Sequence, residues 1–484
     1  MKTIIKNENN NKYIDMQELE KHSNIYSEDS KPLKEEQRNW TTWSMASLWI
    51  GIMVSIPVYM LAGGLIASGM TWIQAIFTIV LGHTIVMIPA VLLGHFGTKY
   101  AVGFPLLSKL VFGPKGNIFP TLLRAFLGCF WFGVQSWIGG TAINSIIINI
   151  IPNLKENFTV QFISYLIFLI INIYIALNGA NALKIFEQFS APILIALSLS
   201  VLIWSYKVAG GFGNIFGYSG LNNGNNFIQI FFPALTAMIA FDSTIAINIS
   251  DYTKNIKKQK QQAIGQFLGA PLMTAFIVFV GVCGTIGAQI EFGEMIWNPA
   301  DLVAKFDNPI IVIVFSVFII IATMTTNIPA NLIPPGIIFS NIWHKIFTYK
   351  KAILLVLGIS IIVMPWKVLE NPNNYIFEVN GTLATFLGPM TGIYLSSYWY
   401  QYKTNIYLFD LFITDGGKYF YHNGWNIYAM IILFISTLLV LIGKFIDFQA
   451  LKFLYESSYV FGLLISFILY AIAIKINNLK KELK

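Results

Sequence analysis

Residues 48–57 read Leu48-Trp-Ile-Gly-Ile-Met-Val-Ser-Ile-Pro57 and interrupt an apolar segment with a glycine, a serine and a proline. Proline inside a helix removes a backbone hydrogen bond and clashes with the preceding turn. A second apolar segment, at residues 227–250, carries Pro233 early and then the polar run Asp242-Ser-Thr244. Two hydrophobic segments interrupted at corresponding places are typical of transporters built from inverted repeats. These two interruptions predict the fold.

The composition places the chain in a membrane. Of its 484 residues, 56% are hydrophobic and only 11% are charged, and the mean hydropathy is +0.64. Soluble globular proteins do not combine these values. Twelve apolar segments of roughly 20 residues, the length that spans a bilayer, lie near residues 43–67, 70–93, 118–150, 158–178, 184–206, 227–250, 262–287, 308–336, 352–369, 380–400, 425–445 and 456–475. The sequence predicts an all-α polytopic membrane protein with 12 transmembrane helices.

The two interrupted segments are the first and the sixth of these spans. This spacing predicts inverted repeats of five helices, residues 41–206 and 227–400, which together form a ten-helix transport core. Two additional transmembrane helices follow in residues 401–475. The polar segments 1–40 and 476–484 are expected to be cytoplasmic tails.

The net charge of +8 does not indicate a nucleic-acid partner, because the distribution of the basic residues indicates membrane topology instead. Basic residues concentrate in alternate loops, at residues 99–124, 254–260, 345–351 and 475–484, whereas the intervening loops are neutral or acidic. Lysine and arginine accumulate on the cytoplasmic side of membrane proteins. We therefore expect a multi-pass protein of the cell membrane with both termini in the cytoplasm.

The eighth span contains the polar strip Ala322-Thr-Met-Thr-Thr-Asn-Ile-Pro-Ala-Asn331. At ~100° per residue, Thr323, Thr326, Asn327 and Asn331 share one helix face, with Thr325 on its flank. Hydroxyl and carbonyl oxygens suit Na⁺, and a carboxamide that donates and accepts suits the amide edge of a planar heterocycle. The alternative is that these groups only hydrogen-bond backbone carbonyls in their own or a neighbouring helix.

The third span carries Trp131 and Gln135, four residues apart and therefore on one helix face. This pair offers a stacking surface beside a hydrogen-bonding amide. Cys129 and Cys283 lie in apolar settings, and the histidines are scattered without metal-ligand spacing. The sequence therefore favours a binding protein over a membrane-embedded metalloenzyme or hydrolase.

The ordered motifs resemble the nucleobase:cation symporter-1 family from about residue 31 to about residue 470. They are Arg38-Asn-Trp-Thr-Thr-Trp43, residues 48–57, Gly97-Thr-Lys-Tyr100, Gly103-Phe-Pro105, Phe112-Gly-Pro-Lys-Gly116, residues 131–140, Asn248-Ile-Ser-Asp-Tyr252, Gly265-Gln266 and the strip in the eighth span. Tyr421-His-Asn-Gly-Trp-Asn426 is similar to the allantoin, uracil and hydantoin permease branch. The resemblance implies a leucine-transporter-type fold with alternating access.

The resemblance also implies residue roles. Trp131 and Gln135 would stack on and hydrogen-bond a planar substrate, and Asn331 would bind its amide edge. A coupling Na⁺ would be held by backbone carbonyls and hydroxyl groups of the first and eighth spans, namely Gly51, Val54, Ala322, Thr325 and Thr326. No organic cofactor is implied.

Two positions of the implied pocket depart from the family pattern. Ser55 stands where relatives carry a longer amide, and Asp242 follows Phe241 where the second stacking tryptophan is expected. Acidic residues inside membrane spans are functional candidates by default. Asp242 could neutralise a cationic substrate such as thiamine, take up a proton that drives transport, or cap a helix that restarts after a break.

We therefore predict a permease that imports a small planar nitrogen heterocycle of the nucleobase, allantoin or hydantoin type by Na⁺ symport. There are two alternatives. The same fold could carry a cationic heterocycle with Asp242 as its counter-ion, or transport could be coupled to H⁺. A channel or an intramembrane enzyme is more remote, because polar residues gather at mid-span and Asp242 has no obvious histidine or lysine partner in the sequence. We expect a monomer.

Overall fold

The computed structural model describes residues 32–154, 157–177, 195–218, 227–343, 346–413 and 416–482, and every regular element within these ranges is helical. The helices of the first half are α2 (Thr42–Met53), α3 (Ile56–Ala67), α4 (Trp72–Tyr100), α5 (Phe104–Gly116), α6 (Ile118–Ile150), α7 (Phe158–Leu177), the helix Ile195–Val208, α9 (Phe212–Phe216), α10 (Phe227–Ile247) and α11 (Ser250–Thr253). Those of the second half are α12 (Gln259–Phe292), α13 (Pro299–Val303), α14 (Pro309–Asn327), α15 (Ile333–Ile342), α16 (Tyr349–Ile362), α17 (Pro365–Val368), α18 (Gly381–Leu395), α19 (Ile427–Leu441), α20 (Gln449–Glu456) and α21 (Ser458–Glu482). Three π-helical segments, η4 (Ile328–Leu332), η5 (Asn374–Asn380) and η6 (Ser396–Gln401), adjoin α14, α15 and α18.

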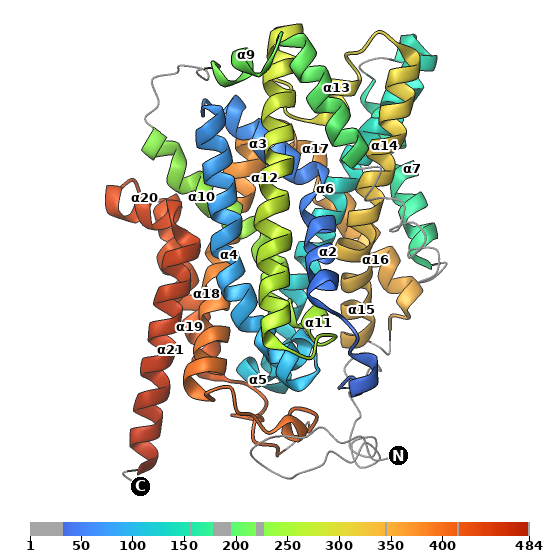
Figure 1. Cartoon of the computed structure of the whole chain (residues 1–484). Coiled ribbons are helices and arrows are strands. Elements are labelled where there is room, and N and C mark those ends of the chain that lie inside the picture. Colours follow the sequence, from blue (N-terminus) through green and yellow to red (C-terminus); the bar gives the residue numbers. More distant parts are fainter. Residues whose placement is uncertain are drawn as a thin grey trace.

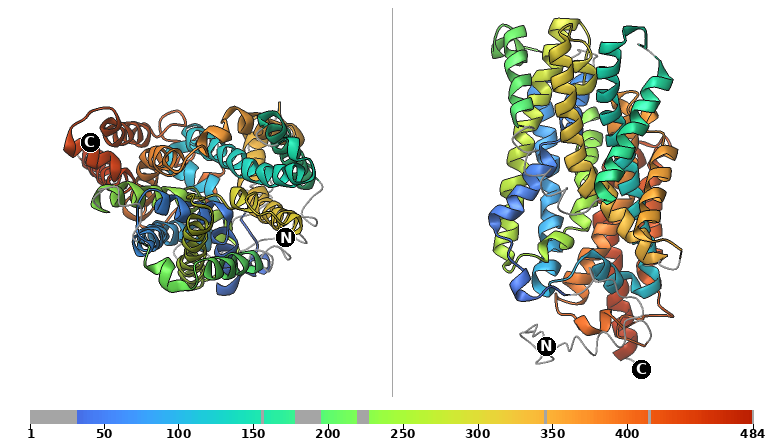
Figure 2. Two further views of the ribbon diagram at one scale, coloured as in Figure 1. Left: turned by 90° about the horizontal axis from the view of Figure 1, so that it is seen from above. Right: turned by 90° about the vertical axis from the view of Figure 1, so that its right-hand side faces the viewer.

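The long helices run side by side in one bundle, which Figures 1 and 2 show from three directions. Among the described residues, eight helices are long and apolar enough to cross a membrane, and the bent pair α2–α3 raises this number to nine. The shorter elements Ile195–Val208, α16 and α18 overlap the three remaining predicted spans. The all-α membrane class is therefore confirmed. The predicted tail 1–40 lies mostly outside the described residues, and the repeat and tail boundaries stay predictions.

The first span breaks where the sequence predicts it. The helices α2 and α3 meet at Val54 and Ser55 with a bend of 52°. Pro57 occupies the second position of α3, where the missing amide hydrogen has no helical acceptor. The amide of Ser55 would bond the Gly51 carbonyl in a continuous helix, but it donates to the Met53 carbonyl at 2.8 Å. The break therefore frees the Gly51 carbonyl from its usual helical partner.

The predicted break at Asp242-Ser-Thr244 is wrong. Helix α10 continues without interruption from Phe227 to Ile247 and includes all three polar residues. Ser243 donates to the carbonyl of Ile239 one turn earlier, so its hydroxyl is satisfied within the helix. Polar side chains inside a membrane helix need a partner, but they need not end the helix. Reading Asp242 as the cap of a restarting half-helix is therefore excluded.

The eighth span is irregular in a different way. Helix α14 passes into the π-helical segment η4, which contains Pro329, and then into α15. Such π-helical turns insert an extra residue into a helix and occur frequently at functional sites. The strip predicted from α-helical periodicity is thus divided, with Asn327 at the end of α14 and Asn331 inside η4.

Close helix packing depends on small residues at the contacts. A Cβ atom at Gly269 of α12 would lie 2.5 Å from the Ala46 carbonyl oxygen and 2.7 Å from the Cβ of Trp49, both in α2. At Gly358 of α16, by contrast, a Cβ atom would meet nothing within 4 Å. Without a hydrophobic force between membrane helices, such close contacts carry much of the packing energy.

These two glycines provide a matched test of the α2–α12 contact. We expect Gly269→Ala to destabilise the protein by ~1–3 kcal/mol, because the methyl group overpacks against backbone atoms. Gly358→Ala should be neutral or stabilising by up to about 1 kcal/mol, since alanine favours the helix. Thermal unfolding of the purified protein in detergent measures both, and equal melting temperatures for the two variants would contradict the packing described.

Candidate functional site

An aromatic cluster forms the core of the site. The indole of Trp131, on α6 and 5% exposed, meets the ring of Phe241 on α10 edge to face, with centroids 5.1 Å apart. Tyr375 of η5 approaches the same indole, with centroids 6.2 Å apart. Trp131, Tyr375, Val54 and Ala322 are buried in one apolar cluster, and Phe241 packs against it. The fold thus brings predicted substrate residues and predicted cation residues into one cluster.

Gln135 lies one turn beyond Trp131 on α6 and connects it to α14. The hydroxyl of Thr326 donates to Oε1 of Gln135 at 3.0 Å. This bond orients the amide, so that Nε2 of Gln135 is left to donate to another acceptor. A residue predicted to bind substrate is therefore hydrogen-bonded directly to a residue predicted to bind the cation.

Asn327 makes the second connection between α14 and α6. It is fully buried, and its Nδ2 donates to the Phe132 carbonyl and to the Ser136 hydroxyl, both at 3.1 Å. Its Oδ1 accepts from Nδ2 of Asn331 at 3.1 Å. Asn331 is thereby oriented from α14, and its Oδ1 remains as an acceptor.

The predicted cation ligands of α14 form local hydrogen bonds. The Thr325 hydroxyl donates to the Ala322 carbonyl at 2.8 Å, and the Thr326 hydroxyl lies 3.4 Å from the same oxygen. Thr323 donates to the Ile319 carbonyl at 2.8 Å, as expected if membrane hydroxyls bond their own helix. A hydroxyl that donates its proton keeps lone pairs that a cation could use. These bonds are therefore compatible with Na⁺ binding.

A cavity of about 130 Å³ lies where the helix break meets α14. Val54, Ser55 and Ile56 line it from the break, and Phe315 and Ile319 line it from α14. Ser55 thus faces a mostly apolar cavity shared by the first and eighth spans. Gly51 has open space on its Cβ side, with nothing within 4 Å.

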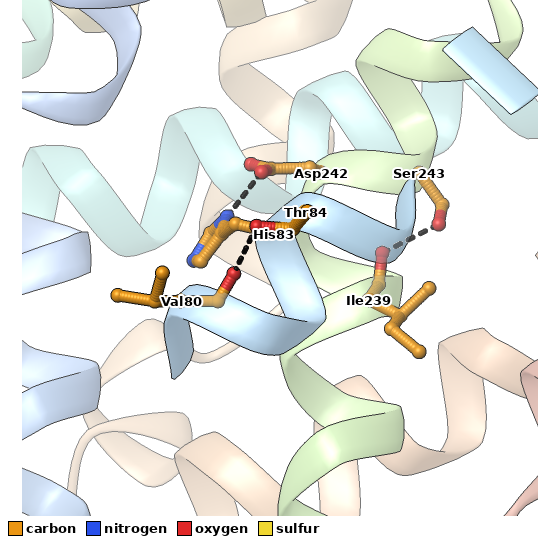
Figure 3. Close-up of polar contacts among 6 residues, drawn as sticks. All are labelled: Val80, His83, Thr84, Ile239, Asp242 and Ser243. Carbon is orange, nitrogen blue, oxygen red and sulfur yellow. Dashed lines mark hydrogen bonds and ion pairs between the residues drawn. The ribbon is translucent and has the colours of Figure 1, made fainter. Parts of the chain in front are cut away.

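Asp242 has a partner that the sequence did not reveal. Its Oδ2 contacts Nδ1 of His83 on α4, and both side chains are fully buried. Figure 3 shows the two side chains directed at each other between α4 and α10, while Ser243 points to the Ile239 carbonyl. The expectation that Asp242 lacks a histidine or lysine partner is therefore wrong. The signal in the sequence was His83, the one histidine within the predicted span 70–93, which lies in α4.

Arg124 is the second residue whose role only the structure reveals. The charge pattern assigned it to a cytoplasmic loop, but it lies in α6 and is 6% exposed. Its Nη2 donates to the carbonyl of Ala330 in η4, at 3.2 Å. Arginine thus supports the irregular backbone next to Asn331.

Comparisons with known proteins agree on one family. A family model described as permease for cytosine/purines, uracil, thiamine, allantoin matches residues 32–464. The purine-uracil permease NCS1 of Arabidopsis thaliana is 35% identical over 438 residues, covering 88% of this chain and 73% of its own. The allantoin permease of Bacillus subtilis is 31% identical over 475 residues, covering 96% of both chains.

A solved structure has the same fold. Mhp1 in its inward-facing conformation superimposes with a TM-score of 0.81 at 23% sequence identity, over 94% of this chain and 95% of Mhp1. This likeness confirms the predicted leucine-transporter-type fold.

The cross-helix bonds of Asn327 give a stability prediction. We expect Asn327→Ala to lower stability by ~1–2 kcal/mol, because it leaves Ser136 and the Phe132 carbonyl without their donor. Thr323→Val removes only a bond within α14 and should change stability less. The melting temperatures of the purified variants decide this, and a larger loss for Thr323→Val would contradict the assignment of the interhelical bonds.

Proposed function

Because the chain belongs to the family of permeases for cytosine, purines, uracil, thiamine and allantoin, we propose that it imports a small planar, uncharged nitrogen heterocycle together with Na⁺. Like its relatives, it is a membrane permease and not an enzyme. The observation that carries the proposal is the contact between Gln135 and Thr326, which joins the proposed substrate site to the proposed cation site.

The proposed substrate site combines aromatic surfaces with one donor and one acceptor. Trp131 and Phe241 offer their rings, and base-like heterocycles stack on aromatic side chains with ~1–3 kcal/mol per ring. Nε2 of Gln135 would donate to a ring carbonyl, and Oδ1 of Asn331 would accept from a ring N–H. An amide or imide edge, as in nucleobases, allantoin and hydantoins, presents both groups. Ser55 would contribute a shorter polar contact from the cavity that it lines at the helix break.

The proposed cation site uses neutral oxygens of two helices. The helix break frees the Gly51 carbonyl, and Val54 adjoins it. From α14, the Ala322 carbonyl and the hydroxyls of Thr325 and Thr326 would complete the set. Unwound carbonyls and hydroxyls of this kind coordinate Na⁺ in transporters with broken helices.

The Thr326 hydroxyl would couple the two sites. When a cation binds its oxygen, the hydroxyl proton is directed away from the positive charge. Oε1 of Gln135 is the nearest of three oxygens that can accept that proton, so cation binding would hold the amide with its Nε2 toward the substrate. Substrate affinity would thus rise with Na⁺, as symport requires.

A cationic substrate is not favoured by the observed contacts. A counter-ion must be open to the ligand, whereas Asp242 is fully buried against His83. We further propose that the protein acts as a monomer in the cell membrane with both termini in the cytoplasm. The start of the described chain and the end of α21 lie toward the same end of the bundle, which supports placing both termini on one side of the membrane (Figure 1).

Substitution of Trp131 tests the substrate site. We expect Trp131→Ala to weaken binding of allantoin or uracil roughly 10- to 100-fold through loss of stacking, and Trp131→Phe to retain most of it. Trp43→Ala, at an exposed tryptophan, is the control. Substrate-induced thermal shifts across a panel of nucleobases, allantoin, hydantoins, thiamine and pyridoxine measure the effect. Unchanged binding in Trp131→Ala would remove the stacking role.

Substitution of Thr326 tests the cation site. We expect Thr326→Val to abolish Na⁺ stimulation of uptake in proteoliposomes, because it removes a ligand and the bond to Gln135, whereas Thr326→Ser retains both. Ser316→Ala, a buried hydroxyl elsewhere on α14 without a partner in the described structure, is the control. Wild-type uptake at the same rate with and without Na⁺ would contradict the proposed coupling ion.

A further inference from the structure

We propose that His83 and Asp242 form a proton-binding site of the transport core, through which a proton is carried with the substrate in addition to Na⁺. The inference rests on the proposed import function. The two side chains join α4 and α10 in the interior of the bundle, and each has an exposed fraction of 0% (Figure 3). No residue of the substrate site or the Na⁺ site proposed above takes part in this contact.

The pair is incompletely satisfied. Nδ1 of His83 and Oδ2 of Asp242 contact each other, but Nε2 of His83 and Oδ1 of Asp242 are buried and have no hydrogen-bond partner among the described residues. Buried polar atoms are almost always partnered, so two such atoms on one pair call for an explanation. Exchange of a proton or a water at these positions provides one.

The charge of the pair depends on one proton. A neutral imidazole beside a carboxylate carries a net charge of −1, and one more proton makes the pair neutral, as imidazolium with carboxylate or as imidazole with carboxylic acid. An uncompensated charge is strongly disfavoured in a buried apolar setting, whereas a neutral pair is tolerated. Gain or loss of this one proton therefore decides whether the buried pair carries a net charge.

No other described side chain neutralises the pair through an ion pair. The elements packed against α4 and α10 contribute phenols and a thiol to the interior: Tyr59 of α3, Cys283 of α12, Tyr375 of η5, Tyr394 of α18 and Tyr459 of α21. The other ionisable groups nearby are engaged elsewhere, His95 with Tyr398, Asp251 with the Phe104 amide, and Glu378 with Lys444. The extra proton is thus the compensating charge available to Asp242 within the described structure.

Phe241 places the pair next to the proposed substrate site. Its ring meets the imidazole of His83 edge to face, with centroids 6.2 Å apart, and meets Trp131 at 5.1 Å. A movement of this ring when substrate binds or leaves would change the access of water to the pair. The proton would enter from external water in the outward-open state, remain on the pair while the site is closed, and pass to cytoplasmic water in the inward-open state.

The test follows protons and substrate together. The full chain is reconstituted into vesicles with equal Na⁺ inside and outside and an internal pH-sensitive dye, and labelled allantoin or uracil is added. We expect uptake by the wild type to acidify the interior and an inward proton gradient to accelerate it. Asp242→Asn and His83→Gln should lose both effects, while Thr84→Val, which removes a neighbouring bond within α4, should retain them.

Labelled uptake by the wild type without acidification would overturn the proton site and leave the proposed permease function standing. A second measurement needs no transport. Infrared difference spectra of the purified protein between about pH 5 and about pH 8, where histidines titrate, should contain imidazole or carboxyl bands that disappear in both Asp242→Asn and His83→Gln. If no such band exists, the pair is only a structural contact between α4 and α10, and the proposal fails even if no tested heterocycle is transported.

Discussion

The hydrogen bonds between α14 and α6 are the interaction on which the centre of the structure depends. The bilayer core offers no water, so polar groups between helices must bond to one another. Asn327 satisfies two acceptors on α6, and Thr326 satisfies Gln135 on the same helix. Two adjacent residues of one helix thus set the position of α14 against α6, and with it the position of the groups that would meet substrate and cation.

Irregular backbone occurs close to these polar contacts. The break between α2 and α3 redirects the Ser55 amide to the Met53 carbonyl. The π-helical segment η4 places Asn331 where its Nδ2 donates to Oδ1 of Asn327. Arg124 bonds the Ala330 carbonyl and so supports η4 from α6. Backbone of this kind is tolerated at membrane depth only where protein or a cavity covers it. The apolar cluster around Trp131 includes Val54 and Ile56 and so covers the break. Ile328 and Leu332 bury η4 in two further apolar clusters.

Local sequence was sufficient wherever a single segment decides the outcome. Proline and glycine signalled the break in the first span, and helical periodicity placed Thr326 and Asn327 on one face, where both contact α6. The same reasoning failed at Asp242, where polar residues were taken for a break in α10. It also failed at Arg124. A charged residue near the end of a span is taken for a loop residue unless its hydrogen-bond acceptor, here the Ala330 carbonyl, is known.

The sequence by itself determined the class of the protein, the approximate spans, the break at residues 54–55 and the residue types of the site, since hydrophobic length, proline and helical spacing act over a few turns. Only the tertiary structure decided which of those residues meet. Thr326 and Gln135 are 191 positions apart, and His83 and Asp242 are 159 apart. Such pairs follow from how helices pack, and helix packing depends on all the buried surfaces together. That is why a lone histidine and a lone aspartate in the sequence became one buried pair in the fold.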